Sequence, residues 1–411
     1  MSWRSYISTD NGHYNFCMLI AFLIPLHKKY VPGFLGLFLL YAIYYAIKRR
    51  RWYFEKSTSH FLIPVALYGM MALGLSAAMD EASALKELEY KASMLLFPML
   101  AILTPKFSIK EAQQILHSFV IGCLVFMLFA IGYGIYRAAI FDSREYLTYS
   151  KLGIYFHPTY MAMYQSLTLL VLLMRGMKMN FLFRKKWLHW SLTMLVILFI
   201  VMLASKAGLI SAGIAILWAL FVSVRRGIIH RHAIAVCLAS LVLLIGLTFT
   251  LPLTAQRVES ATADAAQAAP AEVAHTSTEL RKVTWTAAVD LIKRNPFGVG
   301  VGNASIEMNR SYIEMGQNYA AEKNLNAHNQ FLQVGVELGW IGLLSFLFFL
   351  IIHTIKAVES RSYFYQALIG LSMLNFLFES FLEVQAGVVF FYFLLMIFDR
   401  IDYNTSETIW I

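Results

Sequence analysis

Long apolar runs constrain the fold of this 411-residue chain more than any other feature. A membrane-spanning helix needs about 20 consecutive, predominantly apolar residues, and about twelve stretches of the chain approach or exceed that length. They are residues 14–27, 31–48, 61–79, 92–104, 112–140, 158–174, 187–204, 207–224, 233–250, 330–355, 363–378 and 386–398. The first, fourth and last are short enough to be tilted or half-spanning. We therefore predict an all-α polytopic membrane protein with about twelve transmembrane helices.

The composition supports this fold class and excludes others. Hydrophobic residues make up 59% of the chain and charged residues only 14%, whereas soluble domains carry about 25% charged residues. Cys17, Cys123 and Cys237 all lie in apolar segments, which suggests neither a disulfide framework nor a metal site. The first apolar run is followed by basic residues and not by a small-residue cleavage site, so we expect no cleavable signal peptide.

The distribution of lysine and arginine predicts the orientation. With both termini in the cytoplasm, nineteen of the 34 basic residues fall in cytoplasmic segments, eight in short outer segments and seven in the long loop. Cytoplasmic loops carry the excess of basic residues in membrane proteins. We therefore expect the long loop to lie outside, and we do not take the net charge of +10 as a nucleic-acid signal.

This topology divides a single membrane domain into three parts. Residues 1–250 hold the first nine helices, residues 251–329 form the outer loop, and residues 330–411 hold the last three helices. The loop begins with low-complexity sequence, Ala261–His275, which we expect to be flexible. An amphipathic helix at about 277–294 follows, because Thr276 and Glu279 form a capping-box pattern before an apolar face. A second outer helix is expected at 81–91.

Two positions of the outer loop suggest acid–base and phosphate chemistry. His328 lies at the end of the loop, where a membrane helix begins, and a neutral imidazole there could accept a proton from a sugar hydroxyl. The alternative is a helix cap by Asn326 or Asn329, with His328 merely at the interface. Arg281 could clamp a diphosphate through its planar guanidinium, with Lys282 as a helper, or both could lie on a solvated helix face.

Further polar candidates are expected on the same outer side. Lys206 lies between two spans with almost no loop, where a cation must extend to the interface, pair, or line a cavity. His157 and Tyr160 begin the sixth helix, with Pro158 in its first turn. Arg144 and Lys151 precede that helix and could contact phosphate, although solvated charge is the plainer interpretation.

Three glutamates complete the candidates. Glu379 and Glu383 lie near the last outer loop, either as ordinary loop carboxylates or as partners of the cations. Glu337 lies two turns into the tenth helix, and we expect it to be buried and paired within the bundle.

Two familiar motifs do not apply. No strand precedes Gly298, Gly300 and Gly302, so they do not form a dinucleotide fingerprint. They indicate a turn in which backbone segments pass close to one another. The histidines lack the spacing of zinc ligands, so we expect neither a metal nor a cofactor.

The outer-side pattern resembles the O-antigen ligase family and its relatives, the O-antigen polymerases and the protein O-oligosaccharyltransferases. The resemblance covers roughly residues 200–345. It is carried by Ser205-Lys206, by the loop helix with Arg281 and Trp285, by the turn Pro296–Asn303, and by His328-Asn329 before a helix containing Gly339 and Gly342.

The resemblance implies a fold, a reaction and roles for residues. The fold would be a helical bundle of the C-type glycosyltransferase kind, in the bacterial inner membrane with its active site on the periplasmic face. The donor would be a glycan on undecaprenyl diphosphate and the acceptor lipid A–core oligosaccharide, in an inverting reaction without metal or ATP. The family histidine and loop arginine would correspond to His328 and Arg281, and Asn329 and Trp285 would help to bind substrate. The family usually has arginine where this chain has Lys206, which keeps the charge and loses the planar fork.

Three other functions remain open. A polymerase would use the same lipid-linked donor as its acceptor, and an enzyme that glycosylates proteins is a related possibility. A flippase or transporter of lipid-linked sugar is of another class and is expected to place polar residues deep in several helices, often in repeated halves. Here the candidates gather on one face, which favours an enzyme.

Overall fold

The computed structural model describes residues 11–50, 52–53, 56–177, 182–183, 185–227, 231–266 and 276–403. Helices dominate these residues, and none of them forms a β-strand; an isolated bridge pairs Phe107 with Ile401. The all-α fold class is therefore confirmed.

The helices of the first part of the chain lie largely where the apolar runs predict them. They are α1 (Gly12–Leu23), α2 (Val31–Arg49), α3 (Leu62–Leu73), α4 (Glu81–Lys91), α5 (Ser93–Leu103), α6 (Ile109–Phe141), α7 (Tyr149–Gly153), α8 (Pro158–Met177), α9 (Lys186–Met202), α10 (Lys206–Arg225) and α11 (Arg231–Thr250). Short 3-10 helices flank them at η3 (Lys56–Phe61), η4 (Gly74–Ala77) and η5 (Arg144–Leu147).

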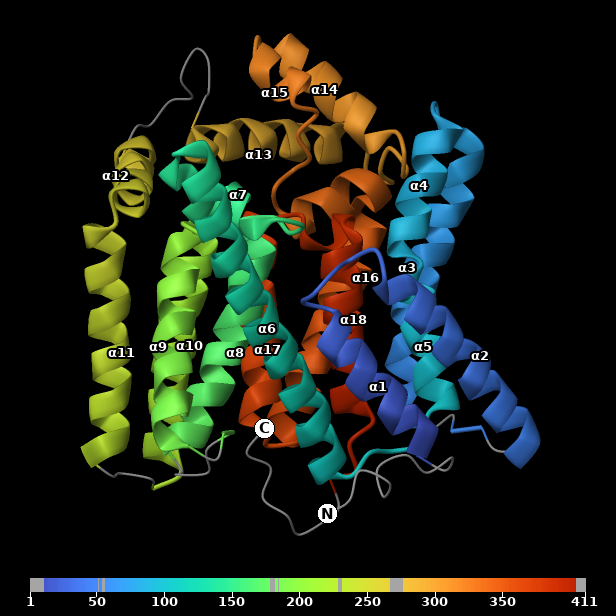
Figure 1. Ribbon diagram of the computed structural model, residues 1–411. Coiled ribbons are helices and arrows are strands. Elements are labelled where there is room, and N and C mark those ends of the chain that lie inside the picture. The colour runs from blue at the N-terminus through green and yellow to red at the C-terminus, as the bar shows by residue number, and fades with distance from the viewer. Residues whose placement is uncertain are drawn as a thin grey trace.

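The second part of the chain contains the long loop, residues 251–329, and the closing helices. They are α12 (Pro252–Ala266), α13 (Ser277–Arg294), α14 (Ala304–Glu314), α15 (Asn318–Glu322), α16 (Gln330–Glu359), α17 (Tyr363–Phe378), η6 (Phe381–Glu383) and α18 (Gln385–Asp399). Figure 1 shows α13, α14 and α15 lying across one end of the bundle, over the ends of the long helices.

Fewer helices than expected have the length and composition of a membrane span. Among the described residues five qualify, and a sixth does if α11 and α12 form one broken span. Several other apolar helices, including α1, α9, α17 and α18, have 12 to 17 residues. The number of about twelve crossings, the orientation and the outer position of the loop stay predictions.

The bundle is held together by packing between particular helices. α8 packs on α10 and α9, α1 packs on α6, and α18 packs on α5. α16 contacts α3, α17 and α13, and so links the helices across the end to the bundle (Figure 1). The end helices α13, α14 and α15 are therefore held in place above α16 and α17.

The start of the outer loop differs from expectation. α12 bends by 87° from α11 at Pro252, where a proline removes a helical hydrogen bond. Residues 261–266, expected to be flexible, continue α12, consistent with the high helix propensity of alanine. The rest of that stretch, residues 267–275, lies outside the described residues.

The glycine turn after α13 joins this helix to α16. The backbone leaves helical geometry at Gly339, with φ 63°, and the turn packs into the break. Gly300 N donates to Glu337 O at 3.0 Å and Trp340 N donates to Pro296 O at 2.9 Å. A Cβ on Gly298 would lie 2.4 Å from Glu337 O, so only glycine allows this approach, as the spacing predicts.

Candidate active site

A polar cavity of about 180 Å³ lies where the end helices meet the bundle. It brings together residues from six segments that are far apart in the sequence. Its lining includes five predicted candidates and several others: Tyr149, His157, Thr159, Ser205, Lys206, Ala207, Arg257, Ser277, Leu280, Arg281, His328 and Glu379.

Glu379 connects the two residues expected to carry the chemistry. One carboxylate oxygen, Oε2, lies 3.1 Å from His328 Nδ1, and the other, Oε1, accepts a hydrogen bond from Arg281 at 3.2 Å. The Glu379 side chain is 8% exposed, whereas His328 keeps 28% of its side chain exposed. The carboxylate can thus fix the imidazole from one side, leaving its other nitrogen available to a ligand.

Local sequence explains where Arg281 stands. The Thr276–Glu279 capping box starts α13, as its spacing predicts, and Val283, Ala287 and Leu291 bury one face of the helix. Arg281 then faces the loop after α17, where its Nε donates to Phe378 O at 3.1 Å. Guanidinium, carboxylate and carbonyl therefore form one fixed group.

The backbone at His328 is held in an unusual conformation. Its φ is 44°, a left-handed value uncommon outside glycine, and its N–H donates to Asn326 Oδ1 at 3.0 Å. Asn329 caps α16 by accepting hydrogen bonds from the N–H groups of Phe331 and Leu332. The helix-cap interpretation thus holds for Asn329, while His328 points its ring to the cavity. Strained residues of this kind concentrate at functional sites.

Lys206 reaches the cavity from the opposite wall. Ser205 caps α10, so Lys206 occupies the first turn, and its Nζ donates to Ser277 Oγ at 3.2 Å and Thr278 Oγ1 at 2.9 Å. These hydroxyls belong to the first turn of α13. Lys206 therefore bridges the bundle and the end helix beside Arg281.

His157 and Tyr160 have different environments. His157 lines the cavity, and desolvation lowers its pKa despite the opposing charge of Glu379. Tyr160 is buried and stacks on Phe381 at 4.6 Å between ring centres. It supports the loop after α17 and does not line the cavity.

The charge of Glu379 is maintained by its neighbours. Burial works to raise its pKa, but the hydrogen bond from His328 and the charges of His328, His157 and Arg281 together lower it. The carboxylate is therefore ionised at neutral pH.

Arg257 is a functional candidate that the sequence did not single out. It stands on α12, and its guanidinium carbon lies 3.8 Å from the centre of the Tyr149 ring, a cation–π contact. Its Nε is buried without a hydrogen-bond partner among the described residues. The signal that could have found it is a lone arginine close after an apolar helix on the presumed outer side.

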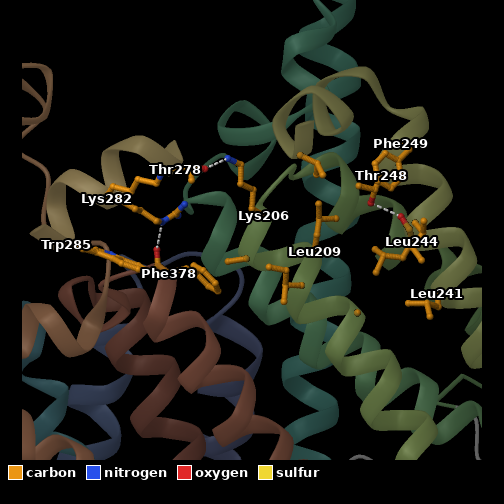
Figure 2. A pocket seen from close by; sticks show the side chains of 16 residues that line it. Lys206, Leu209, Leu241, Leu244, Thr248, Phe249, Thr278, Lys282, Trp285 and Phe378 are labelled. Atoms are coloured by element: carbon orange, nitrogen blue, oxygen red, sulfur yellow. Dashed lines mark hydrogen bonds between the residues drawn. The ribbon is translucent and has the colours of Figure 1, made fainter. Parts of the chain in front are cut away.

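An apolar groove of about 660 Å³ adjoins the polar cavity. Lys206 and Arg281 line both, and Figure 2 shows Lys282 and Trp285 on one side of the groove and Leu241, Leu244 and Phe249 on the other. The remaining lining comes mostly from α10 and α11. The expected substrate residues Lys282 and Trp285 thus face apolar space and do not enter the polar cavity.

Arg144 and Lys151 are not brought to the cavity. Arg144 is exposed on η5, and Lys151 pairs with Glu145 and lies over the Tyr146 ring. Neither lines the cavity or the groove. Their expected role in binding therefore has no support in the geometry.

Glu337 is buried and paired, as expected, with Lys91 at 2.7 Å. Glu87, Glu337 and Glu383 are the group in the described part of the chain close enough to share a metal ion. Lys91 Nζ lies 2.7 Å from Glu337 and 2.7 Å from Glu383. The ammonium group thus supplies a positive charge to these carboxylates.

Residues 191–347, which include Lys206, Arg281 and His328, match the family model described as O-antigen ligase. No curated protein matches the chain. The match agrees with the resemblance carried by these residues and supports a ligase- or polymerase-type glycosyltransferase that acts on lipid-linked glycans. The resemblance to the O-antigen ligase family is therefore confirmed over residues 191–347.

Proposed function

We propose that the protein is an O-antigen ligase of the bacterial inner membrane. It moves a glycan from undecaprenyl diphosphate to lipid A–core oligosaccharide on the periplasmic face, with inversion at the sugar carbon. The observation that carries the proposal is that one cationic cavity holds the His328–Glu379 pair and opens beside an apolar groove.

The cations explain how the donor bond could break. As the bond between sugar carbon and phosphate oxygen breaks, negative charge grows on the diphosphate. Lys206, Arg281 and Arg257 line the cavity, and fixed positive charge stabilises such a leaving group most strongly in the transition state. Because diphosphate leaves without being protonated, a second carboxylic acid of the glycosidase kind is not needed.

His328 has the position of a general base. The oxygen of the acceptor hydroxyl attacks the sugar carbon, and a new C–O bond forms. The proton of that hydroxyl passes to the imidazole. Glu379 fixes the ring through Nδ1 and stabilises the positive charge that the ring gains. Glu379 itself acts through His328 as a positioning residue.

The groove fits the lipid part of the donor. Its lining is almost entirely apolar, from α10, α11 and Phe378 (Figure 2), and it meets the cavity at Lys206 and Arg281. A prenyl chain in the groove would therefore place its diphosphate beside these two cations.

A deletion experiment tests the assignment. Loss of glycan from lipid A–core on a gel of surface glycans supports the ligase, whereas loss of chain length with one repeat still attached indicates a polymerase. Purified protein with donor and acceptor is expected to work in excess EDTA without ATP, and a requirement for either would contradict the mechanism.

Variants separate the two main roles. His328→Ala is expected to spare donor binding and slow transfer by about 10²–10⁴-fold, the usual contribution of a general base. Arg281→Ala is expected to weaken donor binding as well, and Arg281→Lys to rescue poorly because the fork is lost. If His328→Ala abolished donor binding and left turnover normal, the roles would be assigned the wrong way round.

A further inference from the structure

A second polar cavity, of about 290 Å³, lies between α4, α14, the turn before α16 and η6. It shares no lining residue with the cavity around His328. Its volume is at the lower end of the range of about 300–1,000 Å³ for small-ligand sites. The polar part of its lining includes Ser83, Glu87, Tyr90, Asn324, Asn326 and Glu383.

The chemistry of this lining differs from that of the first cavity. Carboxylates accept hydrogen bonds, amides both donate and accept, and hydroxyls do either. The lining has one cation, Lys86, at an exposed position, against Glu87 and Glu383. Such a surface suits a ligand rich in hydroxyl groups, whose apolar faces can pack on a ring such as that of Tyr90.

Buried hydrogen bonds fix the positions of polar side chains at this cavity. Lys91 is buried and bonds both Glu337 and Glu383 at 2.7 Å. Gln333, which also lines the cavity, donates to Glu337 at 2.8 Å and accepts from Ala327 N at 3.1 Å. The polar groups are therefore fixed before a ligand arrives, which lowers the entropic cost of binding.

The same turn faces both cavities. Asn326 lines the second cavity, and its Oδ1 accepts the hydrogen bond from the backbone N–H of His328, which lines the first. The apolar groove, which we propose to hold the lipid of the donor, lies on the other side of the first cavity, at α10 and α11. A ligand in the second cavity would thus approach His328 from the side that the donor does not occupy.

We propose that this second cavity binds sugar residues of the acceptor, and so delivers the acceptor hydroxyl to His328. The inference rests on the proposed function and adds a site to it. Glu87, Glu383, Asn324 and Asn326 bind the sugar hydroxyls.

A cavity-filling variant tests the assignment. Ser305→Trp places a large ring in the cavity from α14, where Ser305 is part of the lining. Arg310→Trp adds the same ring to the same helix, at a residue whose side chain is 59% exposed and which does not line the cavity, and is the matched control. Ser83→Trp fills the cavity from the opposite wall and provides an independent second variant.

The measurements separate acceptor from donor. The acceptor is lipid A–core purified from the deletion strain, and the donor is the cell's own lipid-linked glycan, both with protein in nanodiscs. We expect Ser305→Trp and Ser83→Trp to raise the acceptor KM about tenfold, a loss of roughly 1.4 kcal/mol, with donor affinity unchanged. Binding of acid-released core oligosaccharide to the protein without donor should weaken equally, and Arg310→Trp should change neither quantity.

Two outcomes would overturn the inference. An unchanged acceptor KM in both filled variants, with each protein monodisperse and melting normally, would show that no acceptor sugar uses the cavity. Weakened donor binding with a normal acceptor KM would assign the cavity to the donor glycan. Failure of the proposed function itself is recognised separately, because wild-type protein would then transfer no glycan to lipid A–core.

Discussion

Replacement of Glu379 by glutamine removes one charge from the centre of the site with little change of shape. The carboxylate receives contacts from His328 at 3.1 Å and Arg281 at 3.2 Å, and is 8% exposed. A hydrogen bond to a charged group contributes about 1.5–3 kcal/mol. If the contact with His328 is needed in the transition state, its loss slows transfer by about 10- to 150-fold, since 1.36 kcal/mol corresponds to a tenfold change.

The affinity for the donor should not fall together with the rate of transfer. Glu379 is a negative charge beside the cations that we propose to hold the diphosphate, so Glu379→Gln is expected to leave donor affinity equal or increase it. A general disruption of the fold would weaken both donor binding and transfer. The two quantities together therefore distinguish a positioning role from a structural one.

The assay is single-turnover transfer in nanodiscs, with donor affinity measured separately. Glu314→Gln is the matched control, because that side chain is 65% exposed and lines neither the cavity nor the groove. Transfer by Glu379→Gln within threefold of the wild-type rate would refute the reasoning, as would a loss of donor binding equal to the loss of rate.

The lowered pKa of Glu379 adds a stability test. Because the folded pKa lies below the ordinary value of about 4.3, the contribution of the carboxylate is present above that value and lost as the pH falls through the folded pKa. The difference in melting temperature between wild type and Glu379→Gln should therefore shrink only under acidic conditions below about pH 4. Shrinkage already at pH 6 would contradict the assignment.

Three further predictions concern charge, backbone and orientation. Lys206→Arg is expected to retain transfer and Lys206→Ala to lose much of it in the same assay, and normal transfer by Lys206→Ala would mean that the lysine only extends to the interface. Gly339→Ala should destabilise the protein by about 1–3 kcal/mol in thermal melts from strain at positive φ, with more from a Cβ 2.1 Å from Pro296 O; Gly370→Ala, which meets nothing within 4 Å, is the control. A cysteine at exposed Glu322 should react with an impermeant maleimide in intact spheroplasts, and labelling only after lysis would invert the topology.

Local patterns predicted the parts of the site that depend on neighbouring residues. The capping box at Thr276, the glycine turn and the cap by Asn329 each follow from the sequence over a few residues. The burial and pairing of Glu337 also followed, because a carboxylate deep in an apolar helix needs a partner. Apolar periodicity located the helices in the same way.

Contacts between distant segments could not be predicted from one sequence. Glu379 lies 51 residues from His328 and 98 from Arg281, and apolar periodicity does not say which helix ends meet. Arg257 was missed because its position depends on the bend between α11 and α12. Arg144 and Lys151 line neither the cavity nor the groove, because charge in a loop does not decide which residues reach a cavity.

The glycine turn connects the end of α13 to the break in α16, so a rotation of α13 about this connection moves the far end of the helix most. Arg281 stands thirteen residues from the end of α13 at Arg294, which at 1.5 Å per residue is about 20 Å. A rotation of roughly 5° about this connection would then move Arg281 by almost 2 Å, and a misplacement of about 1 Å can cost about 10²-fold in rate. In the proposed mechanism, a change at Gly298 or Gly339 that shifts α13 therefore also shifts Arg281, although neither glycine lines the cavity.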